Sequence, residues 1–309
     1  MNRWKYVVLS IGLFIGISEV GVRTAGLGNF PIYQTDSEIG YIPAPSQSGK
    51  FLNKNDWCYN DKSMGVSENY EPSEKMDLLL LGDSLVQGGN PYRQVEKLGP
   101  QLQGLLGEEY RVWPIGAPSW GFLNEKEYLD RHPEVMPGLD GLIWVFNSGD
   151  FQDRSKWWTD ATHPRSRPLL LSYYVLNKYV FEGNLKVKYP SLLFWVKSPA
   201  QNSLKRMDEE FDGLSNELQA LQSHPLKYKI IVFYPDKGEF SNHENPFYDF
   251  LSSRIQAQAE ENGWKFIDIR TLPEWKSEYY RDQIHPTPQG YSILSKKIKE
   301  LVEEISSAN

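Results

Sequence analysis

Two short stretches of the chain combine residue types that can carry out nucleophilic chemistry. Gly82-Asp83-Ser84 follows an apolar run at residues 78–81, and Asp282-x-x-His285-Pro286 lies near the other end of the chain. A serine hydroxyl is a poor nucleophile until a base takes its proton, and that base must be oriented by a third group. An aspartate three residues before a histidine can place its carboxylate against the imidazole. An ordinary polar turn is the alternative for Gly-Asp-Ser, but the paired motifs favour a serine nucleophile.

In this order the motifs resemble the first and last sequence blocks of the SGNH/GDSL hydrolase superfamily. The resemblance implies that Ser84 is the nucleophile, His285 the base and Asp282 the residue that orients the imidazole. The G-x-S-x-G elbow of the α/β-hydrolases is not met, because Val86 stands at its second glycine position.

The resemblance also implies an oxyanion hole, whose preformed donors usually supply the largest catalytic contribution in acyl transfer. The first donor is the backbone amide of Ser84. The second is a backbone amide from residues 112–121, where Ser119 stands at the usual glycine position. Gly116 and Gly121 are the alternatives for the turn glycine of this block.

The third block departs from the family pattern Gly-x-Asn-Asp, since the chain reads Asn147-Ser148-Gly149-Asp150. Gly149 stands where the family has the asparagine that donates its side-chain amide. Because side chains alternate along a strand, Asn147, two residues earlier, faces the same side. We therefore expect Asn147 to be the third donor; loss of such a donor costs ~10²–10³ in rate.

Other candidate residues are expected to have no catalytic role. Asp160-x-x-His163-Pro164 repeats the spacing of the last block, but it does not lie between the last strand and the last helix. His132, His224 and His243 are expected at the surface or at caps, and Asp83 is expected to bond nearby backbone amides. No group of residues has metal-ligand spacing, and no cofactor is expected.

The elements that must position these residues alternate between strands and helices. Such alternation predicts a parallel sheet covered on both faces, and Ser84 would then lie at the carboxyl end of a central strand, where ligands of such sheets bind. We expect a three-layer α/β/α sandwich of SGNH type, flavodoxin-like, with about five parallel strands over residues 76–305. The predicted strands are 78–81, 111–115, 142–146, 230–234 and 265–269, and the predicted helices are 94–106, 124–131, 204–222, 246–262 and 288–305.

Two segments interrupt this plan. Residues 26–75 are rich in Gly, Pro, Asn, Tyr and Ser, and they form either a stalk-like linker or an N-terminal extension packed on the domain. Residues 153–205 are an aromatic insertion that leaves the third strand at the edge that carries Ser84. We expect this insertion to be a lid; a membrane-facing patch and simple elaboration of the fold are the alternatives.

Residues 1–25 predict a membrane segment. Arg3 and Lys5 precede an uncharged, mostly apolar run at residues 6–17, and no clear cleavage site follows. We expect a signal-anchor with its amino end inside and the remaining chain extracytoplasmic, in the periplasm. A cleaved signal peptide and a cytosolic amphipathic helix are the alternatives.

Composition narrows the range of partners. The net charge of −7 and the lack of a basic stripe argue against a nucleic-acid partner, and Cys58, the only cysteine, excludes an intrachain disulfide. Exported, anchored SGNH domains resemble the O-acetylesterases and O-acetyltransferases of surface polysaccharides. We therefore expect a serine esterase or O-acyltransferase acting on an acylated carbohydrate or another small ester. A catalytically weak or inactive binding or assembly protein is the alternative, and the sequence gives no oligomeric state.

Overall fold

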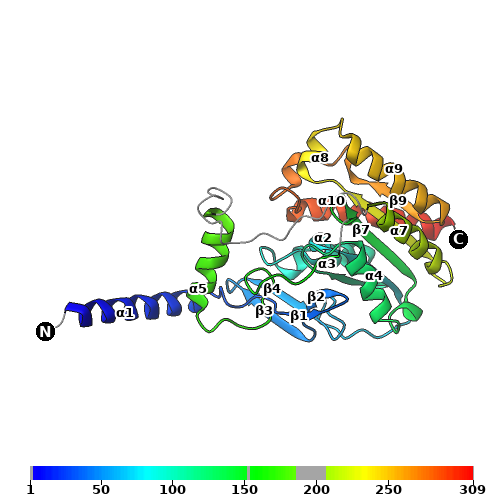
Figure 1. Cartoon of the computed structure of the whole chain (residues 1–309). Coiled ribbons are helices and arrows are strands. Elements are labelled where there is room, and N and C mark those ends of the chain that lie inside the picture. The colour runs from blue at the N-terminus through cyan, green and yellow to red at the C-terminus, as the bar shows by residue number, and fades with distance from the viewer. Residues whose placement is uncertain (1–2, 152–153, 186–206, 309) are drawn as a thin grey trace.

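The structure, a computed structural model, describes residues 3–151, 154–185 and 207–308. Its centre is a five-stranded parallel sheet with the strand order β6-β5-β7-β8-β9 (Figure 1). This is the 2-1-3-4-5 order of flavodoxin-like folds, so the predicted fold class is confirmed. The strands are β5 Met76–Gly82, β6 Tyr110–Gly116, β7 Gly141–Asn147, β8 Tyr228–Tyr234 and β9 Lys265–Asp268.

The central strands are apolar because both of their faces are covered, as in other parallel sheets. Every residue of β7 is buried, and so is every residue of β5 except Met76. Side chains alternate between the two faces: Leu79 and Leu81 belong to one core cluster, and Leu78 and Leu80 belong to the other.

Helices form the two outer layers (Figure 1). Buried residues of α4, α7 and α9 belong to the core cluster of Leu79, and those of α3 and α10 belong to the cluster of Leu78. These helices are α3 Leu98–Leu106, α4 Phe122–Arg131, α7 Met207–Leu221, α9 Pro246–Glu261 and α10 Pro288–Ala308. Short helical turns complete the layers: α2 Ser84–Gln87, η1 Gln94–Glu96, η2 Met136–Gly138, α8 Lys237–Ser241, η5 Ile269–Thr271 and η6 Ser277–Tyr279.

The predicted elements differ from the observed ones mainly at their ends. The predicted helix 94–106 is two helices, η1 and α3, because Lys97 between them has an extended backbone. The predicted strand 265–269 ends at Asp268, whose carboxylate caps the turn that begins at Ile269. Residues 204–206 of the predicted helix 204–222 lie outside the described part of the chain.

The segment 26–75 is packed against the α/β unit and is not a free stalk. It forms two antiparallel hairpins, β1 Tyr33–Asp36 with β2 Gly40–Pro43, and β3 Gln47–Phe51 with β4 Asn55–Tyr59. Apolar side chains from this segment lie in the same buried cluster as Trp113 of β6 and Phe122 of α4: Tyr33, Ile39, Tyr41, Ile42, Met64 and Tyr70.

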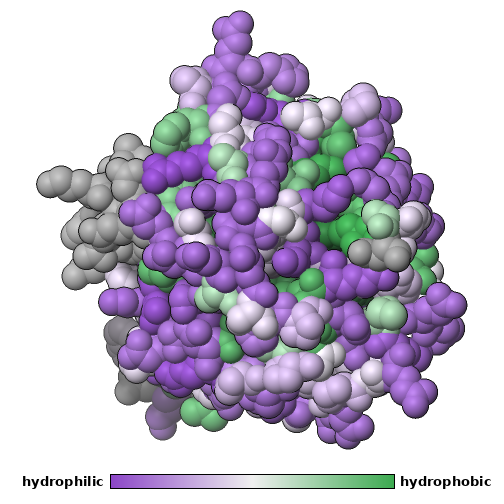
Figure 2. All heavy atoms as spheres, turned by 90° about the vertical axis from the view of Figure 1, so that its right-hand side faces the viewer, coloured by the Kyte–Doolittle hydropathy of each residue, from purple (hydrophilic) through white to green (hydrophobic). Residues whose placement is uncertain are grey.

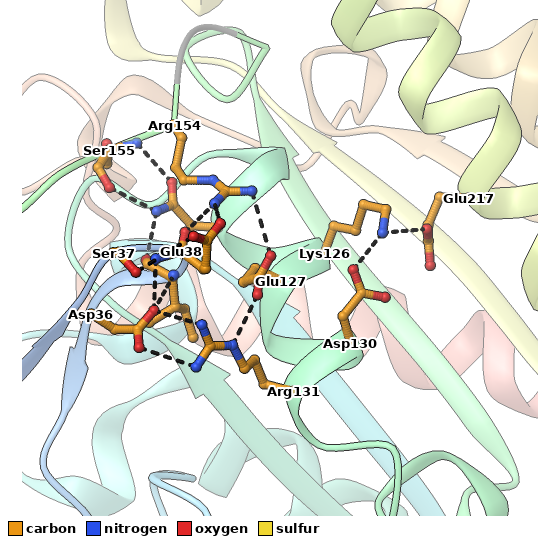
Figure 3. Close-up of polar contacts among 12 residues, drawn as sticks. Asp36, Ser37, Glu38, Lys126, Glu127, Asp130, Arg131, Arg154, Ser155 and Glu217 are labelled. Atoms are coloured by element: carbon orange, nitrogen blue, oxygen red, sulfur yellow. Dashed lines mark hydrogen bonds and ion pairs between the residues drawn. The ribbon is translucent and has the colours of Figure 1, made fainter.

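A network of charged side chains joins the β1–β2 hairpin to α4 and to the start of the insertion (Figure 3). Both guanidinium amino groups of Arg131 donate to Asp36, at 3.0 and 2.9 Å, and its Nε donates to Glu127 at 3.0 Å. Arg154 donates to the backbone and the carboxylate of Glu38 and to Glu127. Isolated surface ion pairs contribute little to stability, but bidentate networks such as this one hold a defined geometry.

One long helix projects from this body. The helix α1, Arg3–Thr24, is apolar and exposed over most of its length (Figure 1). By length and composition, Trp4–Thr24 can cross a membrane, and a signal sequence has the same properties. The insertion contributes the helices α5 Leu171–Val175 and η3 Leu176–Leu185, while residues 152–153 and 186–206 of the predicted lid lie outside the described residues.

Candidate active site

Ser84 begins a short helix at the carboxyl end of β5. Asp83 is the N-cap of this helix α2, and its Oδ1 accepts a hydrogen bond of 2.7 Å from the backbone amide of Leu85. Glycine is needed at the last position of both β5 and β6, because a side chain there would clash with this turn. A Cβ on Gly82 would lie 2.7 Å from Val86, and one on Gly116 of β6 would lie 2.4 Å from the backbone oxygen of Asp83.

His285 reaches Ser84 from the loop that precedes α10. Its Nε2 lies 3.0 Å from Ser84 Oγ, and its Nδ1 lies 2.9 and 3.0 Å from the two carboxylate oxygens of Asp282. The structure therefore brings the three predicted residues into one hydrogen-bonded row. In such a row the imidazole can take the hydroxyl proton while the carboxylate holds the ring in the required tautomer.

Asp282 is held as a carboxylate by its surroundings. Partial burial raises its pKa. Hydrogen bonds from the backbone amides of His285 and Ile284 and from Arg281, together with the charge of His285, lower the pKa by more than burial raises it. The net result is a pKa well below the usual value for aspartate. Asp282 thus remains ionised at any pH at which His285 would need a negative partner.

The second histidine motif lies elsewhere. His163 is buried with its ring 3.9 Å from that of Tyr41 and with its edge toward Tyr33, and burial lowers its pKa to about 4. Its Nδ1 has no hydrogen-bond partner. His163 is thus an aromatic packing residue of the insertion. His132 is the C-cap of α4, and His243 is exposed.

The second block forms a turn whose left-handed residue is Ser119, with a φ of 61°. Gly121 has an ordinary extended backbone, and Gly116 closes β6, so neither supplies the turn conformation. The position of the family's glycine is therefore left-handed here even though a serine occupies it. A serine in this conformation carries backbone strain, of order 1–3 kcal/mol, which the surrounding contacts must offset.

Those contacts come from parts of the chain outside the sheet. The Tyr41 hydroxyl donates to the carbonyl of Pro118, and the Ser155 hydroxyl donates to the carbonyl of Ser119. In return, Trp120 Nε1 donates to the carbonyl of Tyr41 at 2.7 Å. Sequence reasoning missed Tyr41 and Ser155, and no local pattern identifies them, because they lie far from the turn along the chain.

Asn147 lies at the end of β7, next to the site. Its amide nitrogen donates to Asp150 Oδ1 at 2.9 Å and to Asp83 Oδ2 at 3.2 Å, and its oxygen accepts from the backbone amide of Gly149 at 2.7 Å. Both of its amide hydrogens are therefore directed at carboxyl groups. To donate to an oxyanion, Asn147 has to give up the longer contact, the one to Asp83.

Three buried acids from separate parts of the sequence lie near Ser84: Asp83, Glu125 and Asp150. Asp83 and Asp150 share the Asn147 amide, and Glu125 of α4 accepts from Trp144 Nε1 at 2.6 Å while its other oxygen has no partner. Burial raises the pKa of each acid, and repulsion from Asp83 raises those of Glu125 and Asp150 further. Each of these effects favours the protonated form of the acid.

The helix of Ser84 is also held from the N-terminal extension. Gln87, its last residue, is buried, and its amide donates to the Tyr33 hydroxyl at 3.0 Å and to the Tyr59 hydroxyl at 2.8 Å. The first two hairpins thus contact the nucleophile's own helix. Within the described residues, no three His, Cys, Asp or Glu side chains are grouped so as to hold a metal ion.

The buried Glu125 leads to a prediction on pH and stability. Because burial raises its pKa in the folded chain, the folded state keeps a proton that the unfolded chain releases above its ordinary pKa of 4.5. The free energy of unfolding should therefore be lower at pH 8 than at pH 5. Glu125→Gln keeps the acceptor for Trp144 and carries no charge, so the fall should be smaller in this variant.

Urea unfolding of the detergent-solubilised chain at the two pH values measures this difference. Asp130→Asn, at an exposed position of the same helix, is the control and should leave the pH dependence unchanged. Equal pH dependence in Glu125→Gln and the unmodified chain would show that Glu125 is not protonated on folding.

Comparison with known proteins gives matches among solved structures. No protein-family model and no curated protein matches the sequence. The chain is similar to a carbohydrate acetylesterase from Sinorhizobium meliloti, with 15% identity and a TM-score of 0.45 over 75% of this chain and 100% of that chain. It is also similar to a member of the lipolytic G-D-S-L family from Veillonella parvula, with 10% identity and a TM-score of 0.45 over 73% of this chain and 97% of that one.

A third similar structure is the aryl esterase of M. smegmatis, with 14% identity and a TM-score of 0.41 over 74% of this chain and 99% of that chain. At such identities and scores the similarity by itself assigns neither an activity nor a family to the chain. The chain's own topology is more informative, because β5 carries the first block at its carboxyl end and the last block lies between β9 and α10. This topology is the flavodoxin-like α/β/α fold that the motifs predict.

Proposed function

We propose that this chain is a serine-dependent esterase or O-acyltransferase. In this mechanism Ser84 Oγ attacks the ester carbonyl, His285 takes the hydroxyl proton and returns it to the leaving alcohol, and Asp282 holds the imidazolium. The observation that carries the proposal is the row Ser84–His285–Asp282, with successive distances of 3.0 and 2.9 Å. Water then releases the acyl group in a hydrolase, whereas a sugar hydroxyl takes it in a transferase.

For the oxyanion hole we propose the backbone amides of Ser84 and Ser119 as the two principal donors. The Ser84 turn is capped by the Asp83 carboxylate and the Ser119 turn is held by the Ser155 hydroxyl, and such preorganisation is what makes a donor effective. Asn147 is the third donor in this proposal, and it acts once its amide turns from Asp83 toward the developing charge.

The substrate that we propose is an acylated carbohydrate, or another small ester, outside the cytoplasmic membrane. The support is α1, an apolar exposed helix at the amino end with Arg3 and Lys5 at its start. With these basic residues inside, the catalytic domain is extracytoplasmic and anchored by one span. The carbohydrate class rests on the resemblance to exported, anchored SGNH proteins.

A second candidate function is a non-catalytic protein that binds or assembles surface polysaccharide. The third block favours it: Gly149 stands at the family's asparagine position, and the amide hydrogens of Asn147 point at Asp83 and Asp150. Such a protein would keep the fold but would not catalyse ester cleavage. Chemical reactivity of Ser84 separates the two candidates, because only an activated serine attacks a phosphonate.

The first prediction concerns this reactivity. A fluorophosphonate probe should label the full-length chain at Ser84, and Ser84→Ala should abolish the labelling. His285→Gln should lower ester hydrolysis by ~10⁴-fold, because the hydroxyl loses its base. His243→Gln, a change at an exposed histidine, is the control and should keep full labelling. An unlabelled but folded wild-type chain would favour the non-catalytic protein.

The second prediction concerns Asn147. If its amide donates in the transition state, Asn147→Ala should lower kcat by ~10²-fold with little change in KM. Steady-state kinetics on a chromogenic acetyl ester and a melting curve of the same sample measure the two effects separately. A lower melting temperature with unchanged kcat would show instead that Asn147 only holds the carboxyl groups apart.

The third prediction concerns topology. A phosphatase that folds only outside the cytoplasm should be active when fused after Asn309, and a fluorescent protein that matures only in the cytoplasm should stay dark. The unshortened chain should remain with membranes through a high-salt wash, because an apolar span is held by burial and not by charge. A soluble, shortened product would identify residues 1–25 as a cleaved signal peptide, and a cytoplasmic carboxyl terminus would exclude the extracytoplasmic substrate.

A further inference from the structure

The insertion after β7 contacts α1, the candidate membrane helix. Its helical segment at residues 171–185, formed by α5 and η3, lies across the inner end of α1, where α1 joins the body (Figure 1). Figure 1 shows the two helices running in clearly different directions from this junction. If α1 crosses a membrane, a helix placed across its end lies along the membrane surface.

A single acidic residue holds the two helices together. Glu19, the only acidic residue of α1, accepts hydrogen bonds from the backbone amides of Leu171 at 3.0 Å and Ser172 at 2.9 Å. These amides belong to the first turn of α5, whose unpaired donors need such a partner. Arg23 pairs with Glu19 and donates to the carbonyl of Leu169 at 2.9 Å. The polar groups at this end of α1 thus serve to fix α5.

One face of α5 is buried against the N-terminal extension. Leu171 and Tyr174 belong to a buried cluster with Phe30, Phe51 and Trp57, and Val22 of α1 packs on the same cluster. The Tyr174 ring stacks on that of Phe30 with 5.0 Å between centroids. These contacts place α5 firmly between α1 and the hairpins, so that its other face has a defined direction.

That other face is apolar and exposed. Tyr173 is 65% exposed and Leu169, just before the helix, is 96% exposed. Leu170, Tyr173, Leu176 and Val180 follow one another at spacings of three, three and four residues, and Leu169 lies beside Leu170 just before the helix. We call this set the apolar strip: Leu169, Leu170, Tyr173, Leu176 and Val180. Exposed apolar groups gathered in this way mark a surface that contacts another apolar phase.

The adjoining surface points to lipid as that phase. The apolar side chains of α1 are exposed along its length, for example Phe14 and Val20, and the strip begins where this helix ends. No acidic residue occurs from Ala161 to Phe181, whereas Arg167 and Lys178 do, so that nothing in this stretch repels anionic headgroups; Arg165 is paired with Asp160. The face of the molecule on the side away from α1 is mostly hydrophilic (Figure 2).

We propose that the apolar strip of α5 and η3 inserts into the interfacial layer of the bilayer that α1 spans. The proposal rests on the membrane anchorage under Proposed function and adds a second, in-plane contact to it. The strip supplies apolar and tyrosine side chains of the kind that favour this layer. Two contacts instead of one fix the rotation and tilt of the domain relative to the membrane.

The active site is coupled to this contact through the insertion. Ser155, near the start of the insertion, donates to the carbonyl of Ser119, and the carbonyl of Pro164 accepts from the backbone amide of Tyr33 at 2.8 Å. The segment that carries the strip therefore also holds the second-block turn. It follows that the sheet edge that carries Ser84 is held at a fixed distance from the bilayer. Such a position would favour an ester substrate located at the membrane surface.

Fluorescent labels in lipid nanodiscs test the proposal on the full-length chain. In a Cys58→Ser background, an environment-sensitive label is attached to Tyr173→Cys, Phe14→Cys or Phe250→Cys, and quenching by doxyl-labelled lipids is measured. Phe14 lies in α1 and reports the anchor; Phe250 is a comparably exposed aromatic of α9. We expect quenching at positions 14 and 173 and none at position 250.

The outcomes separate the anchor from the strip. Quenching at position 14 with a water-exposed label at position 173 would overturn the strip and leave the anchor intact. A label at position 14 in water would overturn both. A label at position 173 that is shielded from aqueous iodide and also from doxyl lipid would show that a second copy of the chain covers the strip.

A paired substitution provides the matched control. With the label on Leu169→Cys, Tyr173→Asp with Leu176→Asp should abolish most of the lipid quenching, because a carboxylate is costly to bury among acyl chains and is repelled by anionic headgroups. Phe247→Asp with Phe250→Asp has the same three-residue spacing on α9 and should leave it unchanged. All four positions are exposed, so folding should survive. Equal quenching in both double variants would contradict the proposal.

Discussion

Parallel pairing of β5 with both β6 and β7 is the constraint on which the site depends. In register, Gly82 lies beside Gly116, and β7 ends at Asn147 on the same edge of the sheet. The carboxyl ends of parallel strands meet at one edge, so the first, second and third sequence blocks converge there without any contact between them along the chain. The absence of a Cβ at Gly116 lets β6 approach the backbone of Asp83. This close approach brings the second-block turn toward Ser84.

The carboxyl groups near Ser84 lie in two different electrostatic environments. Asp83, Glu125 and Asp150 lie together in the core, where an ionised carboxyl is costly unless it is hydrogen-bonded. Asp282 is the opposite case, because backbone amides and Arg281 stabilise its charge at the partly exposed rim. Acids that favour a proton thus lie behind Ser84, and an acid that favours its charge lies behind His285. The two environments push neighbouring carboxyl groups toward different protonation states.

Parts of the chain outside the sheet complete this arrangement. The N-terminal hairpins contact the helix of Ser84 through Tyr33, Tyr59 and Gln87, and Tyr41 supports the turn of Ser119. The insertion supports the same turn through Ser155 and then packs against α1 through Glu19. An extension and an insertion therefore connect α1 to the edge of the sheet that carries Ser84, which ties the geometry of the candidate site to this end of the chain.

The sequence by itself determined the fold class and the candidate residues Ser84, Asp282 and His285. Short apolar runs that end in turn residues are typical of buried strands, and each motif is local, so neither inference needs a distant contact. Asp83 likewise caps its own helix as expected. The left-handed backbone at Ser119 agrees with the glycine position that the resemblance assigned, although the residue itself gave no such signal.

Tertiary structure decided the remaining features, because they arise between residues far apart along the chain. The amide of Asn147 faces Asp83, 64 residues away, and Glu19 caps a helix that begins 152 residues later. Residues 26–75 pack against the domain because their apolar side chains share a core with residues of α4 and β6. Periodicity and motif spacing describe only residues that are close to one another along the sequence. The partners of a buried polar group are set only when several elements close around it.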